Sequence, residues 1–305
     1  MKRFLAGFLV LVLILGSFAS CTKTENNDEK ILLVASFYPI YIFTLNIVDG
    51  IDEIQVQCMA EQNIGCLHDY QLLSRDAKLI SDADAFIING AGMETFLEDV
   101  YRSVENLNVI DSSENVKLLE NCDEHHEKHN HSEEHHDHNH SVNSHIWMSP
   151  ENAKKQVSNI AEKLIELYPQ YEEQINKNKA DYILRIENLQ IVLKESTKEL
   201  QKQNIITFHE SYDYLADEFS LNIVATVESH EGGEPSAKGL AELTAVIKKY
   251  NVSYLFVEPG YKGSAAEILK NETGVEICVL NPVLTGDGSL TSYENIMENN
   301  LKAVS

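Results

Sequence analysis

Residues 171–201, YEEQINKNKADYILRIENLQIVLKESTKELQ, are the strongest indication of the architecture, because this segment is long and contains neither proline nor glycine. A continuous helix of about 30 residues would be about 45 Å long, which is long for a helix inside one small domain. Its apolar side chains recur at steps of roughly 3.6 residues, at Ile175, Tyr182, Ile186, Leu189, Val192 and Leu193. A coiled coil is the alternative, but apolar heptad spacing is not sustained. The stretch therefore predicts a rigid helix that links two halves of the chain.

Strand and helix patterns alternate on both sides of this helix. Before it, ILLVASF (31–37) opens the series of strands and NVIDSS (108–113) closes it. After it, NIITF (204–208) opens a second series and VEICVLNP (275–282) closes it. Such alternation predicts parallel sheets flanked by helices. We therefore expect an α/β protein with two lobes, each built on a mainly parallel four-stranded sheet, with the boundaries 31–170 for the first lobe, 171–201 for the linker helix and 202–305 for the second lobe.

The first 21 residues are expected to direct export and not to join the fold. Lys2 and Arg3 precede the apolar run FLAGFLVLVLILG, which is shorter than the roughly 20 residues of a membrane-spanning helix. The run ends in SFASC, and a cysteine at this place resembles a bacterial lipobox. The resemblance implies a lipoprotein signal peptide (1–21), a lipid on Cys21 that anchors the protein to the outer face of the cell membrane, and a polar tether (22–30). The alternative is an ordinary cleaved signal peptide with a chance cysteine.

The composition is strongly acidic. Lys and Arg number 24 and Asp and Glu number 48, so the formal net charge is 24 − 48 = −24. Nucleic acid is excluded as a partner, because its phosphates repel carboxylates. The charge suits a protein that attracts cations, although a solvated acidic surface would give the same balance. Outside the cytoplasm the four remaining cysteines permit disulfides, and Cys58 with Cys66 is the nearest pair in sequence, while Cys122 and Cys278 leave the connectivity open.

One segment is extremely rich in histidine. DEHHEKHNHSEEHHDHNH, residues 123–140, has no apolar periodicity and is highly charged, so it predicts a mobile surface loop. Closely spaced imidazoles on such a loop can bind several zinc ions weakly, but ordering the loop around one ion costs conformational entropy. We expect the loop to act as an auxiliary collector or sensor through His125, His126, His129, His131, His135, His136, His138 and His140. A solvated loop with incidental metal affinity is the alternative.

Three further histidines, His68, His145 and His209, each stand where a strand or loop gives way to a helix. In α/β folds, ligands bind beyond the carboxyl ends of the strands. His68 and His145 would come from the first lobe and His209 from the second. A metal ion held by all three would lie in the cleft between the lobes, and three dispersed residues on rigid lobes favour a single tight site.

Several segments resemble the substrate-binding proteins of metal-ion ABC transporters. CLHDYQLLSRDAKLI surrounds His68, and SHIWMSPENA resembles the family pattern Asp-Pro-His-x-Trp-x-(Ser/Asp)-Pro-x-Asn-Ala around His145. TFHESYDYLADEFSL surrounds His209, and GEPSAKGLAEL and FVEPGYKGSAAEIL match further family stretches. The resemblance covers nearly all of the mature chain. It implies two α/β lobes joined by a long helix, and a receptor that delivers zinc or manganese to an ABC permease driven by its ATPase subunit.

The resemblance to this family also indicates which metal ion and which ligands to expect. Manganese-type members carry a glutamate where this chain has His209, so three imidazoles make Zn²⁺ the expected ion and Mn²⁺ the less favoured one. Leu67 stands where the family has proline, and Asn281 stands where it often has aspartate. The fourth coordination position is therefore open between water and a protein group, for which the candidates are Asn281, Cys66, Glu258 and Glu61.

Two other functions fit the same residues. A metal-buffering or adhesive surface lipoprotein would use this fold without a permease. A zinc hydrolase would also use three histidines and a water. However, HESYD (209–213) has Asp213 where the second histidine of a zinc-hydrolase HExxH helix belongs, and His209 is predicted to close a strand. We therefore expect a monomeric zinc-binding receptor and no enzyme.

Overall fold

The computed structural model describes residues 30–60, 70–120, 142–227, 234–261 and 263–304. The stretch Ile31–Ser305 forms one compact unit, and Met1–Lys30 is a separate one. Outside the described residues lie the predicted signal peptide with Cys21, the tether up to residue 29 and the histidine-rich segment 123–140. Within the described residues, no helix is both long and apolar enough to cross a membrane.

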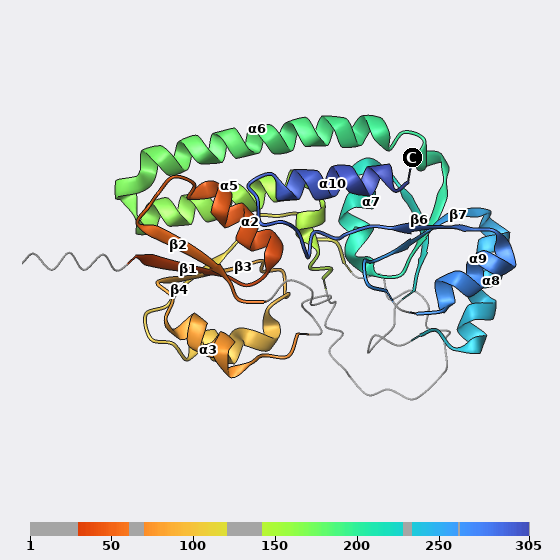
Figure 1. Ribbon diagram of the computed structural model, residues 1–305, viewed down its shortest axis with the longest axis horizontal. Coiled ribbons are helices and arrows are strands. Elements are labelled where there is room, and N and C mark those ends of the chain that lie inside the picture. Colours follow the sequence, from red (N-terminus) through yellow and green to blue (C-terminus); the bar gives the residue numbers. More distant parts are fainter. Residues whose placement is uncertain (1–29, 61–69, 121–141, 228–233, 262, 305) are drawn as a thin grey trace, which may run out of the picture. The chain divides into compact units, whose positions relative to one another are not determined.

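The first lobe is built on a four-stranded parallel sheet with the order β2-β1-β3-β4 (Figure 1). Its strands are β1 (Ile31–Ala35), β2 (Ile54–Cys58), β3 (Ala85–Ile88) and β4 (Asn108–Asp111). All four residues of β3 are buried, as expected for a central strand of a parallel sheet that is covered on both faces. The helical segments of this half are α2 (Tyr38–Ile47), α3 (Ser74–Ser81), η3 (Thr95–Leu97), α4 (Glu98–Arg102), η4 (Ile146–Met148) and α5 (Pro150–Leu167).

The second lobe repeats the same strand order. Its sheet is parallel and runs β6-β5-β7-β8, so the strand that opens each series has the corresponding inner place in its sheet. The strands are β5 (Asn204–Thr207), β6 (Asn222–Thr226), β7 (Val252–Val257) and β8 (Glu276–Val279). The helical segments are η7 (Glu210–Tyr212), α7 (Asp213–Phe219), α8 (Ala237–Tyr250), α9 (Ala265–Thr273) and α10 (Ser292–Lys302). The predicted fold class, two α/β lobes with parallel four-stranded sheets, is confirmed.

The long helix between the lobes is α6 (Glu172–Ser196), which begins after the short turn η5 (Pro169–Tyr171). It packs against α5, α2 and α10 and runs from one lobe towards the other (Figure 1). The chain then makes the turn η6 (Leu200–Lys202) before β5. The expected apolar stripe is buried except at Val192, which is 44% exposed. Val192 precedes the buried Leu193 by about 100° of helical rotation and therefore points away from the lobes.

One hydrophobic core cluster runs across both lobes, and a second cluster lies within the second lobe. Trp147, from the first lobe, is fully buried, and its Nε1–H donates to the carbonyl of Pro282 in the second at 2.8 Å. The hydroxyl of Tyr293 on α10 donates to the Trp147 carbonyl at 2.9 Å. These bonds join the segment that carries His145 to the segment that follows β8. The relative position of the two lobes is thus held by buried contacts as well as by the linker helix.

The described cysteines carry free thiols. Cys58 and Cys278 are both unpaired, and the candidate partner Cys66 lies outside the described residues. The Cys58 thiol donates to the Ala60 carbonyl at 3.1 Å, and its burial raises its pKa to about 12. The pairing of Cys58 with Cys66 that the sequence spacing suggested stays a prediction, and a thiol with this raised pKa is protonated at neutral pH.

Candidate metal centre

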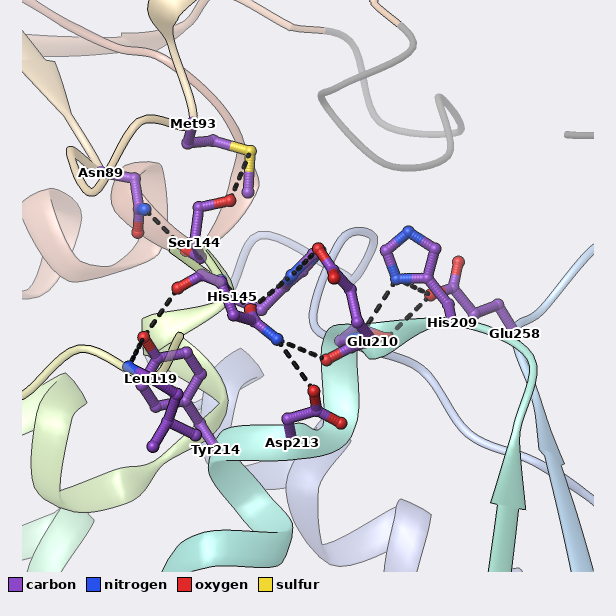
Figure 2. Close-up of polar contacts among 12 residues, drawn as sticks. Asn89, Met93, Leu119, Ser144, His145, His209, Glu210, Asp213, Tyr214 and Glu258 are labelled. Carbon is purple, nitrogen blue, oxygen red and sulfur yellow. Dashed lines mark hydrogen bonds and ion pairs between the residues drawn. The ribbon is translucent and has the colours of Figure 1, made fainter. Parts of the chain in front are cut away.

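Two of the three predicted ligands, His145 and His209, meet at the boundary between the lobes. Their ring centroids are 4.9 Å apart and the ring planes make an angle of 82°. His209 follows the carboxyl end of β5 and begins η7, whereas His145 begins η4 in the first lobe (Figure 2). The strand-end position expected for His209 is therefore observed, and the fold brings imidazoles from residues 64 positions apart into contact.

His145 is fully buried and tightly oriented. The side-chain oxygen of Asn143 accepts from the backbone N–H of His145 at 2.9 Å and lies 3.0 Å from its Nδ1. Because an amide oxygen only accepts hydrogen bonds, Nδ1 carries a proton, and in the neutral form of the ring the lone pair is then on Nε2. A neutral imidazole with its Nδ1–H held by the protein is the usual form of a metal-binding histidine.

His209 has a different set of neighbours. The backbone N–H of Ser211 donates to its Nδ1 at 3.1 Å, and a carboxylate oxygen of Glu258 lies 3.7 Å from the same nitrogen. That oxygen also accepts from the Ser211 hydroxyl at 3.0 Å. The side chain of His209 is 30% exposed. Because Nδ1 accepts from the Ser211 N–H, the proton of a neutral His209 ring lies on Nε2 in this geometry, and that proton has to leave Nε2 before a metal ion can bind there.

A second carboxylate, that of Glu210, lies beside the other ring. Its Oε1 is 3.8 Å from Nδ1 of His145, across the lobe boundary (Figure 2). The paired imidazoles are thus flanked by Glu210 on one side and Glu258 on the other. This arrangement places two carboxylates beside two imidazoles, a set of groups that suits a divalent cation and not an anion.

The remaining predicted site residues fall into two groups. His68, Cys66 and Glu61 lie in 61–69, outside the described residues, as do all eight histidines of the auxiliary segment. Among the residues that are described, no three His, Cys, Asp or Glu side chains lie close enough together to hold a metal ion.

Asn281 is described, and its amide is used by its own loop. Its side-chain N–H donates to the Thr285 carbonyl at 2.8 Å, and its side-chain oxygen accepts from the Leu284 backbone N–H at 3.2 Å. Its backbone N–H donates to the side chain of Asn300 at 2.8 Å. In this geometry the amide shapes the turn after β8.

The buried carboxylate of Glu94 is linked by hydrogen bonds to the segment that carries His145. Glu94 accepts from the Ser36 hydroxyl at 2.7 Å and from the backbone N–H groups of Asn89 and Gly90 at 2.8 and 3.0 Å. Asn89 in turn donates to the carbonyl of Ser144 at 2.9 Å. Burial raises the pKa of Glu94 to about 7, against the lowering effect of its three donors. Glu94 therefore ties the ends of β1 and β3 to the segment that presents His145.

Asn143, Glu210 and Glu94 were not predicted from the sequence. Asn143 and Glu210 stand close to predicted ligands in the chain, which was the available signal, but their contacts link residues about 70 positions apart. Glu94 carried no local signal, because only burial sets it apart from an ordinary surface carboxylate. The hydrolase alternative finds no support in the site: His209 precedes a 3₁₀ turn and Asp213 begins α7, so the HExxH helix is not formed.

Two α/β lobes joined by a single long helix are the architecture that this chain shares with solved two-lobed substrate-binding proteins. The chain belongs to the family described as zinc-uptake complex component A, periplasmic, whose family model matches residues 33–305.

Named relatives agree with this placement. The chain is 31% identical over 289 residues to the zinc-binding lipoprotein AdcA of Streptococcus pneumoniae strain R6, covering 93% of this chain and 57% of AdcA. It is 31% identical over 306 residues to the high-affinity zinc uptake system protein ZnuA of Bacillus subtilis strain 168, covering 98% of this chain and 94% of that one. The chain thus spans little more than half the length of AdcA and nearly all of the B. subtilis relative.

Solved structures show the same fold. The Zn(II)-bound ZnuA-like domain of S. pneumoniae AdcA superposes with a TM-score of 0.73 at 29% identity, covering 90% of this chain and 97% of that domain. The substrate-binding protein FpvC of Pseudomonas aeruginosa, in complex with Ni²⁺, gives 0.75 at 27% identity over 90% and 95% of the two chains. Neighbours of this fold have thus been solved with different divalent metal ions.

Proposed function

We propose that this protein is an extracytoplasmic receptor that captures Zn²⁺ between its lobes and delivers it to an ABC permease, which imports the ion with energy from its ATPase subunit. The observation that carries the proposal is the contact of His145 and His209, one from each lobe, at a ring-centroid distance of 4.9 Å. Membership of the zinc-uptake family supports the same conclusion.

The ligands in this proposal are His68, His145 and His209, with zinc as the transported substrate. His145 and His209 would bind through Nε2. Zinc at Nε2 of His209 would require the ring proton to be carried by Nδ1, which would give up the hydrogen bond from the Ser211 N–H and donate instead towards the Glu258 oxygen 3.7 Å away. We assign Glu258 to this orienting role. Water is the simplest occupant of the fourth position, because Asn281 is engaged in its own loop.

The lobe boundary suits a site that is largely formed before the ion arrives. Trp147 bonds to the Pro282 carbonyl across the boundary. Glu218 of α7 accepts from the Ser149 hydroxyl and from the Glu151 backbone N–H at the start of α5. Together these bonds across the boundary, of which the Trp147 bond is buried, resist rigid-body separation of the lobes, so closure on zinc should be small.

The parts of the chain outside the described residues complete the proposal. Cys21 would carry the lipid that keeps the receptor at the outer face of the membrane, beside the permease. The eight histidines of 123–140 would collect zinc weakly and raise its concentration near the cleft. The receptor would act as a monomer.

Zinc titration of single variants tests the proposal. His68→Ala, His145→Ala and His209→Ala should each weaken tight zinc binding by at least about 100-fold, since a tetrahedral site loses one of three protein ligands. A variant lacking 123–140 should keep the tight site and lose only weak, additional binding. Tight binding that survives His209→Ala but disappears with residues 123–140 would place the site in the histidine-rich segment. Zinc uptake by cells lacking the gene separates import from metal buffering or adhesion, for which uptake would stay normal.

A further inference from the structure

Asn143 is the most completely bonded polar residue at the lobe boundary. Asn143 is 1% exposed, and each of its polar groups has a hydrogen-bond partner. The backbone N–H donates to the Leu119 carbonyl at 2.9 Å, and the backbone carbonyl accepts from the Tyr214 hydroxyl at 2.7 Å. The side-chain oxygen faces His145, and the side-chain N–H₂ donates to the Glu210 carbonyl at 3.0 Å and to the Asp213 carboxylate at 3.2 Å.

We propose that Asn143 is a positioning residue for the metal centre. It orients His145 and connects it to the turn η7, which follows β5 in the second lobe. The proposal rests on the proposed function, since it assumes that His145 binds the ion. One amide does two things at once. Its oxygen holds Nδ1–H of His145, so that Nε2 presents its lone pair, and its nitrogen binds the turn that directly follows His209.

The amide makes both contacts because it carries an acceptor and two donors. A carboxylate at this position could still accept from Nδ1 of His145, but it has no hydrogen to donate to Glu210 or Asp213 and would face two oxygen acceptors. A methyl group would make neither contact and would leave the donors of His145 without an acceptor in a buried place. Asn143→Asp therefore breaks the link between the lobes and keeps the acceptor, whereas Asn143→Ala breaks both.

The Asn143 side chain influences the distance between the two imidazoles. His145 is held by the oxygen of Asn143, and His209 is held through the chain to Glu210, whose carbonyl binds the nitrogen of the same amide. Loss of the amide frees each ring to move relative to the other. Groups that orient a metal-binding histidine typically contribute 10- to 100-fold to metal affinity.

The chain offers a matched control in Asn178 on α6. This amide is also buried, and its nitrogen donates to the carbonyls of Ile47 and Asp49 at 3.0 and 2.8 Å. Its oxygen accepts from Gln174 at 2.9 Å. Asn178 thus makes the same kinds of bonds as Asn143, but to the loop after α2 and to its own helix. Substitution there costs stability by the same mechanism without touching either histidine.

The test compares Asn143→Asp and Asn143→Ala with Asn178→Asp and Asn178→Ala in the full mature protein. Zinc affinity is measured by competition with a chelator, the melting temperature is measured without metal, and the visible spectrum of bound Co²⁺ reports ligand geometry. We expect Asn143→Ala to weaken zinc binding by about 10- to 100-fold and to alter the Co²⁺ spectrum. Asn143→Asp should weaken binding less, and both Asn178 variants should lower the melting temperature with wild-type affinity and spectrum.

Two results would overturn the inference. One is wild-type affinity and an unchanged Co²⁺ spectrum in both Asn143 variants. The other is a loss of affinity that merely follows the fall in melting temperature and is equal in the Asn143 and Asn178 variants. Failure of the proposed function is a separate result, because the wild-type protein itself would then bind no zinc tightly. If Asn143→Ala does not fold, Asn143→Asp decides the question alone, since it preserves the size of the side chain.

Discussion

The carboxylate of Glu258 lies 3.7 Å from Nδ1 of His209 and accepts a hydrogen bond from the Ser211 hydroxyl at 3.0 Å. Glu258 follows the carboxyl end of β7, and His209 follows that of β5, the neighbouring strand. Adjacent parallel strands therefore deliver a ligand and the group that orients it to one edge of the second sheet.

The first prediction concerns this pair. Glu258→Gln keeps the shape of the side chain and removes the charge that would hold Nδ1–H of His209 when Nε2 binds zinc. We expect zinc affinity to fall by about 10-fold or more, as chelator competition would show. Glu242→Gln is the control, because it makes the same charge change on α8, where the carboxylate pairs with Lys238. An equal loss in both variants would mean that overall charge, and not orientation of His209, is responsible.

The second prediction concerns pH. Burial raises the pKa of Glu94 from its ordinary 4.5 to about 7, so the folded protein holds this proton more tightly than the unfolded chain. The stabilisation is full below about pH 4.5 and is lost as the pH rises through 7, by at most about 3 kcal/mol. Glu94→Gln cannot titrate, so its free energy of unfolding should fall less than that of the wild type between pH 5 and pH 8. Urea denaturation at a series of pH values measures this difference, and parallel curves would contradict it.

The third prediction separates backbone strain from steric conflict. Gly90 and Gly274 both have positive φ, +76° and +79°, so alanine strains the backbone at either position by about 1 kcal/mol. At Gly274 a Cβ atom meets nothing within 4 Å, whereas at Gly90 it would collide with the side chains of Asp111 and Ser113. Gly90→Ala should therefore cost about 1–3 kcal/mol more than Gly274→Ala in denaturant unfolding. Equal costs would show that the loop after β3 yields easily.

The fourth prediction concerns Asn281. Both ends of its amide bond within residues 281–285, so Asn281→Ala should lower the free energy of unfolding by about 1–2 kcal/mol through lost hydrogen bonds. Zinc affinity should remain that of the wild type. A strong loss of affinity with little change in stability would instead assign Asn281 to the metal as its fourth ligand.

Local sequence patterns predicted the fold class well. The alternation of strand and helix signals is a short-range property, and it was enough to predict both sheets and the helix α6 between them. His209 could be placed at a strand end for the same reason. Val192 was assigned to the buried stripe in error, because its neighbour Leu193 fits the 3.6-residue period better.

Long-range contacts could not be predicted from local sequence patterns. Asn143 reaches Asp213 across 70 residues, and Trp147 reaches Pro282 across 135. No periodicity encodes which polar side chain will be buried opposite another. The raised pKa of Glu94 likewise depends on the burial that the folded chain imposes on it.

Trp147 also provides an intrinsic fluorescence signal. It is the single tryptophan of the chain, it is fully buried, and its ring centroid lies 5.2 Å from that of His145. All indole fluorescence therefore arises from one place, beside a ring proposed to bind the ion and on the bond that joins the lobes. Arrival of zinc at His145 and any shift of Pro282 would alter the same emission, so the unlabelled protein can signal its own loading and unloading in real time.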